Sequence, residues 1–151
     1  ILLEFPRAIS DACDLSSEAL SVAQINALRL GVSARLNLEA KSWSDIDSGQ
    51  WDLIVSNPPY ITSSVIPSLE PEVKDFDPLL ALDGGTDGLD CYRSIAPVIK
   101  QRLHPEGSAF LEIGYDQGAS VCDICRQADL AVRALVRDYA GLDRVVEIGT
   151  I

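Results

Sequence analysis

The four residues Asn57-Pro58-Pro59-Tyr60 carry the most specific chemical pattern in this sequence. They follow the segment 51–56, whose continuous apolar centre is typical of a parallel strand buried on both faces. Each proline restricts the residue before it, so the Asn57 side chain and the Pro58 carbonyl are presented in defined directions. Two oxygen acceptors beside the ring of Tyr60 suit an amine or an amide NH2. The pattern therefore favours a substrate site over a plain proline-rich turn.

A second candidate for chemistry is Asp14, which ends a predicted strand over 9–15. Ser16 and Ser17 follow, and either can cap a helix. An acidic side chain at the carboxyl end of a parallel strand can accept hydrogen bonds from both ribose hydroxyls of a nucleotide-like cofactor. A turn or capping aspartate would have the same local sequence. The pattern alone leaves the two interpretations open.

The elements that position these residues alternate along the chain, which predicts an α/β fold with a mostly parallel sheet. Strands are predicted over 9–15, 35–39, 51–56, 108–113, 132–138 and 144–148, and helices over 16–30, 87–103 and 117–128. The last two strands are separated only by a turn at Gly141, so they must form an antiparallel pair. Asp87 can cap the second helix, and Pro97 should kink or shorten it. His104 to Gly107 reads as a turn.

The segment between the proline pair and the second helix is rich in Pro, Asp and Gly. Prolines at 67, 71 and 78 make long regular structure unexpected there. The cluster Gly84-Gly85-Thr86-Asp87-Gly88 is read as a turn, because it does not lie between a first strand and its helix.

The composition describes one globular domain over 1–151. The chain has 151 residues, 47% of them hydrophobic, and a formal net charge of -11. Such a composition excludes disorder. The acidic charge argues against direct nucleic-acid binding, and no apolar run is long enough to span a membrane. We expect no metal site and no membrane partner.

Four cysteines form no disulfide framework, which favours a reducing, cytoplasmic compartment. Cys122 and Cys125 read C-x-x-C. We interpret them as two buried helix residues at i, i+3, with a redox or metal pair as the alternative.

The motif at 57–60 resembles the signature of S-adenosylmethionine-dependent methyltransferases that modify amino groups of adenine or the amide of glutamine. Further blocks are similar to the glutamine methyltransferase family that acts on peptide chain release factors. They are Asp52-Leu53-Ile54-Val55-Ser56, Glu72-Val73, Asp77-Pro78-Leu79-Leu80-Ala81-Leu82, Asp87-Gly88-Leu89, Glu112-Ile113-Gly114-Tyr115-Asp116-Gln117, Arg137-Asp138 and Asp143-Arg144-Val145-Val146. This resemblance covers nearly the whole chain.

The resemblance implies a Rossmann-like class I methyltransferase, with S-adenosyl-L-methionine as cofactor and a release factor as protein substrate. It implies that the Asn57 side-chain oxygen and the Pro58 carbonyl accept the two N–H bonds of the target amide. The implied substrate-binding residues are Asn57, Pro58, Pro59, Tyr60, Glu72 and Pro78, of which Asn57, Pro58 and Tyr60 are catalytic. The implied cofactor-binding residues are Asp14, Leu15, Ser42, Trp43 and Asn57. Ser42 stands where the family usually has an acidic residue, which affects one adenine contact.

The family's glycine-rich cofactor loop and first strand would precede Ile1, and the chain contains no Met. We therefore expect a partial methyltransferase domain, the C-terminal part of a longer enzyme. The missing strand would lie between the strands at 9–15 and 51–56, leaving two unpaired edges. Weak or absent cofactor binding by the chain alone, self-association, and partial disorder near 1–15 would follow.

Three other functions compete with release-factor methylation. They are methylation of a ribosomal-protein glutamine, methylation of an adenine amino group in nucleic acid, and a non-catalytic fragment that acts as a binding module. A nucleic-acid enzyme would need a basic groove and aromatic clamps, and neither is visible.

Overall fold

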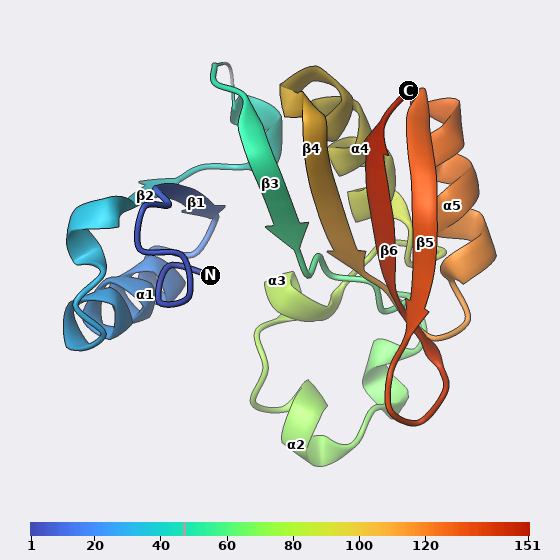
Figure 1. Cartoon of the computed structure of the whole chain (residues 1–151). Helices are drawn as coiled ribbons and strands as arrows, with labels where there is room; N and C mark the ends of the chain where they lie inside the picture. The colour runs from blue at the N-terminus through green and yellow to red at the C-terminus, as the bar shows by residue number, and fades with distance from the viewer. Residues whose placement is uncertain (47) are drawn as a thin grey trace. The chain divides into compact units, whose positions relative to one another are not determined.

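A computed structural model describes residues 1–46 and 48–151 of the chain (Figure 1). The chain divides into two compact units, Ile1–Asp47 and Ser48–Ile151, called here the N-terminal and the C-terminal unit. That the two act as one methyltransferase domain stays a prediction.

The N-terminal unit is a strand–helix–strand arrangement, as the sequence predicts. It contains β1 (Ser10–Asp14), α1 (Ser17–Arg29), η1 (Ser33–Arg35), β2 (Leu36–Ala40) and η2 (Trp43–Asp45). β1 and β2 pair in parallel. The hydroxyl of Ser16 caps α1 by accepting from the amide of Ala19 at 3.1 Å. Gly31, at φ +67°, follows the end of the helix, where a left-handed residue favours glycine.

The N-terminal unit buries little apolar surface. Among its described residues, the fully buried hydrophobic side chains are Ala27 and Val32. Several large apolar side chains are exposed, including Ile9, Leu15, Val22, Ile25 and Leu28. The guanidinium of Arg35 instead ties the start of the chain to the strand pair, by donating to the carbonyls of Leu2, Phe5 and Ala8.

The C-terminal unit is built on a mixed four-stranded sheet with the order β3-β4-β6-β5. These strands are β3 (Trp51–Ser56), β4 (Leu103–Glu112), β5 (Leu130–Arg137) and β6 (Asp143–Thr150). β3 and β4 are parallel, whereas β6 is antiparallel to both β4 and β5. The predicted antiparallel end of the sheet is therefore confirmed, and Gly141 lies in its turn at φ +80°.

Two helices, α4 (Asp90–Arg102) and α5 (Gly118–Gln127), cover one face of this sheet (Figure 1). Residues of β4 alternate between the two faces, so Ala109, Leu111 and Ile113 are fully buried while Phe110 and Glu112 are only half-buried. Tyr92, Ile99 and Val121 of the helices are fully buried as well. The chemistry-bearing strand ends thus rest on a packed core.

The segment between β3 and α4 contains only short helical turns, as its prolines predict. They are η3 (Ile66–Ser68), α2 (Pro71–Lys74) and α3 (Leu79–Leu82).

The predicted turn at His104 to Gly107 is wrong, because β4 begins at Leu103 directly after α4. The register explains the mistake. Trp51 pairs with Leu103 and Leu53 pairs with Ser108, so β4 advances five residues while β3 advances two. The turn-like residues are accommodated as an irregularity within the strand.

Two details of α4 also differ from the sequence prediction. The helix continues from Pro97 to Arg102, so the predicted shortening is wrong, while the alternative, a kink at Pro97, stays a prediction. Pro97 is exposed, so water can satisfy the carbonyl that its missing N–H leaves free. The N-cap is Leu89 and not Asp87. Asp87 instead accepts from the amide of Leu89 and pairs with Arg93.

Cys122 and Cys125 are both buried on α5, which confirms their interpretation as buried helix residues. Burial raises the pKa of the Cys125 thiol to about 12. Within the described ranges, no three His, Cys, Asp or Glu side chains are grouped so that they could hold a metal ion. No helix in the described part of the chain is long and apolar enough to cross a membrane.

Candidate active site

The loop 57–60 leaves the sheet directly at the carboxyl end of β3. The last residue of β3, Ser56, pairs with Leu111 of β4. Asn57 is exposed, Pro58 is buried, and Pro59 and Tyr60 are half-buried. The sheet therefore fixes the start of the loop, and the Asn57 side chain remains accessible.

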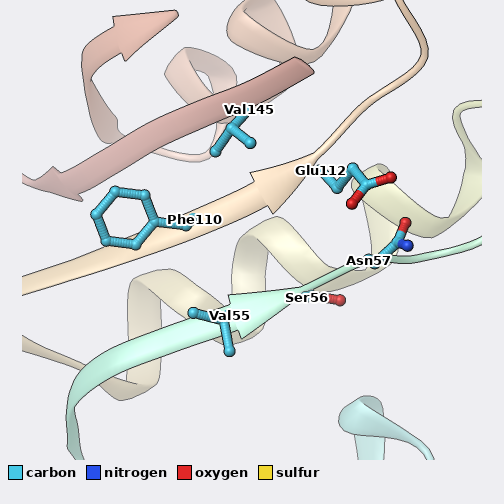
Figure 2. A pocket seen from close by; sticks show the side chains of 6 residues that line it. All are labelled: Val55, Ser56, Asn57, Phe110, Glu112 and Val145. Carbon is cyan, nitrogen blue, oxygen red and sulfur yellow. The ribbon is translucent and has the colours of Figure 1, made fainter. Parts of the chain in front are cut away.

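The Asn57 side chain borders an open hollow of about 320 Å³. The residues that line it come from three neighbouring strands and are Val55, Ser56, Asn57, Phe110, Glu112 and Val145. Figure 2 shows the Asn57 amide and the Glu112 carboxylate side by side beyond the ends of β3 and β4. One end of the hollow is thus polar, and the part over the strands is apolar.

Glu112 connects the hollow to the aromatic residues around it. The Tyr60 hydroxyl donates to Oε1 of Glu112 at 3.5 Å, the long limit for such a bond. The Tyr92 hydroxyl donates to the backbone carbonyl of Glu112 at 2.8 Å. Burial, followed by the nearby Tyr60, raises the pKa of the Tyr92 phenol well above its ordinary value. That phenol stays protonated and fixes the end of β4.

At the other end of the loop, the backbone of Ile61 forms hydrogen bonds with the chain around the end of α3. The amide of Ile61 donates to the Leu82 carbonyl at 3.0 Å, and the amide of Gly84 donates to the Ile61 carbonyl at 2.8 Å. Asp83 stabilises this turn by accepting from the Ser63 hydroxyl at 2.6 Å and from the amide of Gly85. These hydrogen bonds, Ser63 first, lower the pKa of Asp83.

The glycine turn packs against the Tyr60 backbone so closely that side chains would not fit. A Cβ on Gly84 would lie 2.8 Å from the Tyr60 Cα. A Cβ on Gly88 would lie 2.5 Å from the Tyr60 carbonyl oxygen, and Gly88 also has φ +74°. The cluster is a turn, as predicted, and it also supports the loop 57–60.

Gln117 bridges the loop to the segment between β4 and α5. Its Oε1 accepts from the amide of Gly114 at 2.9 Å. Its Nε2 donates to the carbonyls of Tyr60 and Gly88 at 3.0 and 3.1 Å. Both ends of the carboxamide are therefore used to hold backbone near the loop.

Arg144 supports the same segment from β6. Its Nη1 donates to the Ile113 carbonyl at 3.2 Å. Its Nε and Nη2 donate to Asp138 at 3.2 and 3.1 Å. The amide of Leu142 is the first cause of a lowered Asp138 pKa, and the Arg144 guanidinium adds to it.

Glu72 and Pro78 lie elsewhere on the C-terminal unit. Glu72 is exposed on α2, and Pro78 is the exposed residue that precedes α3. Neither is among the residues that line the hollow. Their substrate-binding role stays a prediction.

Apart from Asn57, the candidate cofactor residues belong to the N-terminal unit. Oδ1 of Asp14 accepts from the amide of Ser16 at 2.8 Å, so Asp14 does organise a turn. Its carboxylate is nevertheless exposed at the carboxyl end of a parallel strand, which fits the hydroxyl groups of a ribose. The exposed Leu15 follows it. Ser42 caps η2 in a capping box with Asp45, and the half-buried Trp43 is the first residue of that turn.

Four residues near the loop have no individual role predicted from the sequence: Glu112, Phe110, Val145 and Gln117. One available signal is the alternation of side chains along the strand predicted over 108–113, which places Phe110 and Glu112 on the same face of the sheet. Nothing in the sequence signals that the Gln117 carboxamide reaches the Tyr60 carbonyl.

Several solved structures with the same fold are methyltransferases. A methyltransferase from Pyrococcus furiosus has a TM-score of 0.69 at 14% identity, and the match covers 99% of this chain and 67% of that one. A ribosomal protein L11 methylase from Lactobacillus delbrueckii subsp. bulgaricus has a TM-score of 0.65 at 19% identity, covering 95% and 58%. The fold is therefore that of the class I S-adenosylmethionine-dependent methyltransferases, whose members include an O-methyltransferase from neocarzinostatin biosynthesis solved with S-adenosyl-L-homocysteine.

Curated relatives identify the family within this class. A release factor glutamine methyltransferase of Caulobacter vibrioides is 46% identical over 147 residues, which are 97% of this chain and 51% of the relative. One of Agrobacterium fabrum is 40% identical over 146 residues, 97% of this chain and 50% of the relative. The chain spans about half the length of these relatives, and over that half it belongs to the release factor glutamine methyltransferase family. No family model matches.

Proposed function

We propose that the protein transfers a methyl group from S-adenosyl-L-methionine to the side-chain amide nitrogen of a glutamine in a peptide chain release factor. The observation that carries the proposal is the exposed Asn57 amide at the polar end of the hollow, on a loop anchored at both ends. The names of the curated relatives support the same reaction.

An amide nitrogen is a poor nucleophile, because its lone pair is delocalised into the carbonyl. A general base helps little, since the neutral amide is a very weak acid. The remaining route is positioning and electrostatics. The Asn57 side-chain oxygen and the Pro58 carbonyl accept the two N–H groups and aim the nitrogen at the methyl group. Both acceptors also stabilise the positive charge that grows on nitrogen, and the methylated nitrogen then releases one of its two protons to solvent to give the neutral product amide.

The surroundings of Asn57 suit this chemistry. Tyr60 packs on the aliphatic part of the glutamine, and the nearby Glu112 carboxylate adds negative potential where the positive charge develops. Phe110, Val55 and Val145 give an apolar floor. Apolar side chains beside the N–H bonds reduce the competition from water for those bonds.

S-Adenosyl-L-methionine supplies an electrophilic methyl group on its sulfonium. Asp14 would accept from its ribose hydroxyls, with Leu15 beside it, and Trp43 would lie near its adenine. Ser42 lacks the carboxylate that the family usually has there, so one adenine contact would be weaker. Asn57 would border both the cofactor and the substrate.

A protein substrate agrees with the charge of the chain. A net charge of -11 favours a basic partner surface and repels a phosphate backbone. Release factors enter the ribosome and meet RNA, so a basic surface on them is reasonable. Glu72 and Pro78, exposed on the C-terminal unit, are proposed contacts for such a partner. A cytoplasmic location would bring the enzyme and release factors together.

The test compares Asn57→Ala with wild type in the full-length protein that carries this sequence. Transfer of labelled methyl from S-adenosyl-L-methionine to a release factor should fall about 100-fold or more, while cofactor affinity is retained. Peptide mass spectrometry should place the methyl group on a glutamine.

Asn26→Ala, an exposed asparagine on α1, is the matched control and should transfer methyl normally. Ribosomal proteins and a DNA duplex offered as competing acceptors distinguish the other candidate reactions. Unchanged transfer by Asn57→Ala, or methylation only of a competing acceptor, would overturn the proposal. A chain that binds release factor without transferring methyl would instead be a binding module.

A further inference from the structure

The Tyr60 carbonyl is held by a side chain 57 positions away in the sequence. Nε2 of Gln117 donates to it at 3.0 Å, and the same nitrogen donates to the Gly88 carbonyl at 3.1 Å. Both distances are within the range of well-formed N–H···O bonds. One carboxamide thus joins the end of the substrate loop to the glycine turn.

Gln117 is itself firmly placed. Its Oε1 accepts from the Gly114 amide at 2.9 Å, and its own amide donates to the Gly114 carbonyl at 3.0 Å. It is also the residue that precedes α5, whose buried side chains pack in the core. A donor anchored in this way can fix a backbone carbonyl and does not merely follow it.

The loop transmits this constraint because it contains two consecutive prolines. Pro58 and Pro59 have restricted φ, and each limits the residue before it. The β3–β4 pairing fixes Ser56 at one end, and Gln117 fixes Tyr60 at the other. Few rotatable bonds remain between the two anchors, and they include those that aim Asn57 and the Pro58 carbonyl.

We propose that Gln117 is a positioning residue for the methyl transfer, acting through the Tyr60 carbonyl to set the direction of the Asn57 and Pro58 acceptors. This inference rests on the proposed function. The required side chain must accept one hydrogen bond and donate two. Among side chains of this length, only a carboxamide does both.

Two variants separate the effect of the hydrogen bonds that Gln117 donates from the effect of the size of its side chain. Gln117→Glu keeps the size and the acceptor for Gly114, but it turns an oxygen toward two carbonyl oxygens. Gln117→Leu removes all three bonds. We expect kcat to fall about tenfold or more in both variants, since a misplacement near 1 Å can cost about 100-fold. KM for the release factor should change less than about threefold, because the residues that contact the partner are intact.

The pH profile distinguishes positioning from a loss of stability. The carboxyl group introduced by Gln117→Glu can donate to the Tyr60 carbonyl when it is protonated, whereas its carboxylate form cannot. The activity of Gln117→Glu relative to wild type should therefore rise as the pH is lowered from about 8 toward about 5.5. The activity of Gln117→Leu relative to wild type should not change with pH. Gln127→Glu and Gln127→Leu, at the exposed far end of α5, are matched controls and should behave as wild type.

Amide hydrogen exchange gives a readout that needs no activity. The amides of Ile61 and Gly84 flank the held carbonyl and should exchange at least about tenfold faster in both Gln117 variants, because opening the loop loses a bond network. The amides of the β5–β6 pair should be unchanged. If Gln117→Leu does not fold, the isosteric Gln117→Glu variant alone tests the positioning role of Gln117.

Unchanged kcat and unchanged exchange in a folded Gln117→Glu would overturn the inference. So would a kcat loss without recovery at low pH. If the wild-type protein transfers no methyl to release factor while the Gln117 variants still exchange faster at Ile61 and Gly84, the result would count against the proposed function and leave the anchoring of the loop standing.

Discussion

The loop 57–60 and the turn at Asp14 occupy the same kind of place, each at the carboxyl end of a parallel strand, but they are held in different ways. Tyr60 is bonded to Glu112 and Gln117, which are 52 and 57 positions away. Asp14 is bonded to Ser16, two positions away. The loop 57–60 therefore depends on distant parts of the C-terminal unit, whereas the turn at Asp14 is organised by its own neighbours.

The two units that carry these sites also differ in the size of the hydrophobic side chains that they bury. Tyr92, Leu111 and Ile113 are fully buried in the C-terminal unit. In the N-terminal unit the buried hydrophobic side chains among the described residues are the smaller Ala27 and Val32. A site built from distant residues needs such a core to fix it, and a local turn does not.

The largest effect should come from Gly88→Ala. Its Cβ would meet the Tyr60 carbonyl oxygen at 2.5 Å in a residue with φ +74°, so both a clash and backbone strain arise. We expect about 3 kcal/mol of lost stability in urea unfolding. Gly31→Ala, at φ +67° with nothing within 4 Å of its Cβ, is the counterpart in the N-terminal unit and should lose about 1 kcal/mol. Equal losses would contradict the contrast between the two regions.

A smaller effect is expected from Asp14→Asn in the full-length protein. Asparagine can still accept from the Ser16 amide, so the turn should persist, but it offers one acceptor oxygen where the ribose needs two. Affinity for S-adenosyl-L-methionine, measured by calorimetry, should fall about tenfold, because a hydrogen bond to a charged group is lost. Glu18→Gln, in the first turn of α1, is the control. An unchanged affinity would leave Asp14 as a turn residue alone.

The smallest effect concerns Asp138, which holds Arg144 against the Ile113 carbonyl. Its pKa is lowered in the folded state from an ordinary value of 3.8, first by the Leu142 amide. The stability it contributes is therefore present above pH 3.8 and is lost as the pH falls through the folded pKa. Asp138→Asn should differ most from wild type at neutral pH and converge with it in acid.

Chemical unfolding of Asp138→Asn across this pH range checks the direction. Asp123→Asn removes the same charge from the exposed ion pair with Arg126 and should destabilise less. A wild-type advantage that grows below pH 3.8 would contradict the assignment.

Local sequence predicted the elements well where one physical signal dominated. The apolar run at 51–56 is the parallel strand β3, but its predicted burial on both faces is wrong, because Leu53 and Val55 are exposed. Of the two candidate serines, Ser16 caps α1. The proline pair predicted a rigid loop with Asn57 presented in a defined direction, and Asn57 is exposed at the rim of the hollow.

Prediction failed where distant parts of the chain decide the outcome. The turn-like sequence at His104 to Gly107 is absorbed into β4, because pairing with β3 resumes at Ser108. α4 is not shortened at Pro97, since that residue faces solvent. The bond from Gln117 to Tyr60 depends on where β4 places its end, which no local pattern encodes. The roles of the site residues themselves remain predictions.

The division into two units has a spectroscopic consequence. The chain has two tryptophans, and Trp43 belongs to the N-terminal unit while Trp51 begins β3 of the C-terminal unit. Replacing either one by phenylalanine leaves a single tryptophan, whose emission reports on one unit. Emission from the two single-tryptophan chains shows directly whether the units melt together or one after the other.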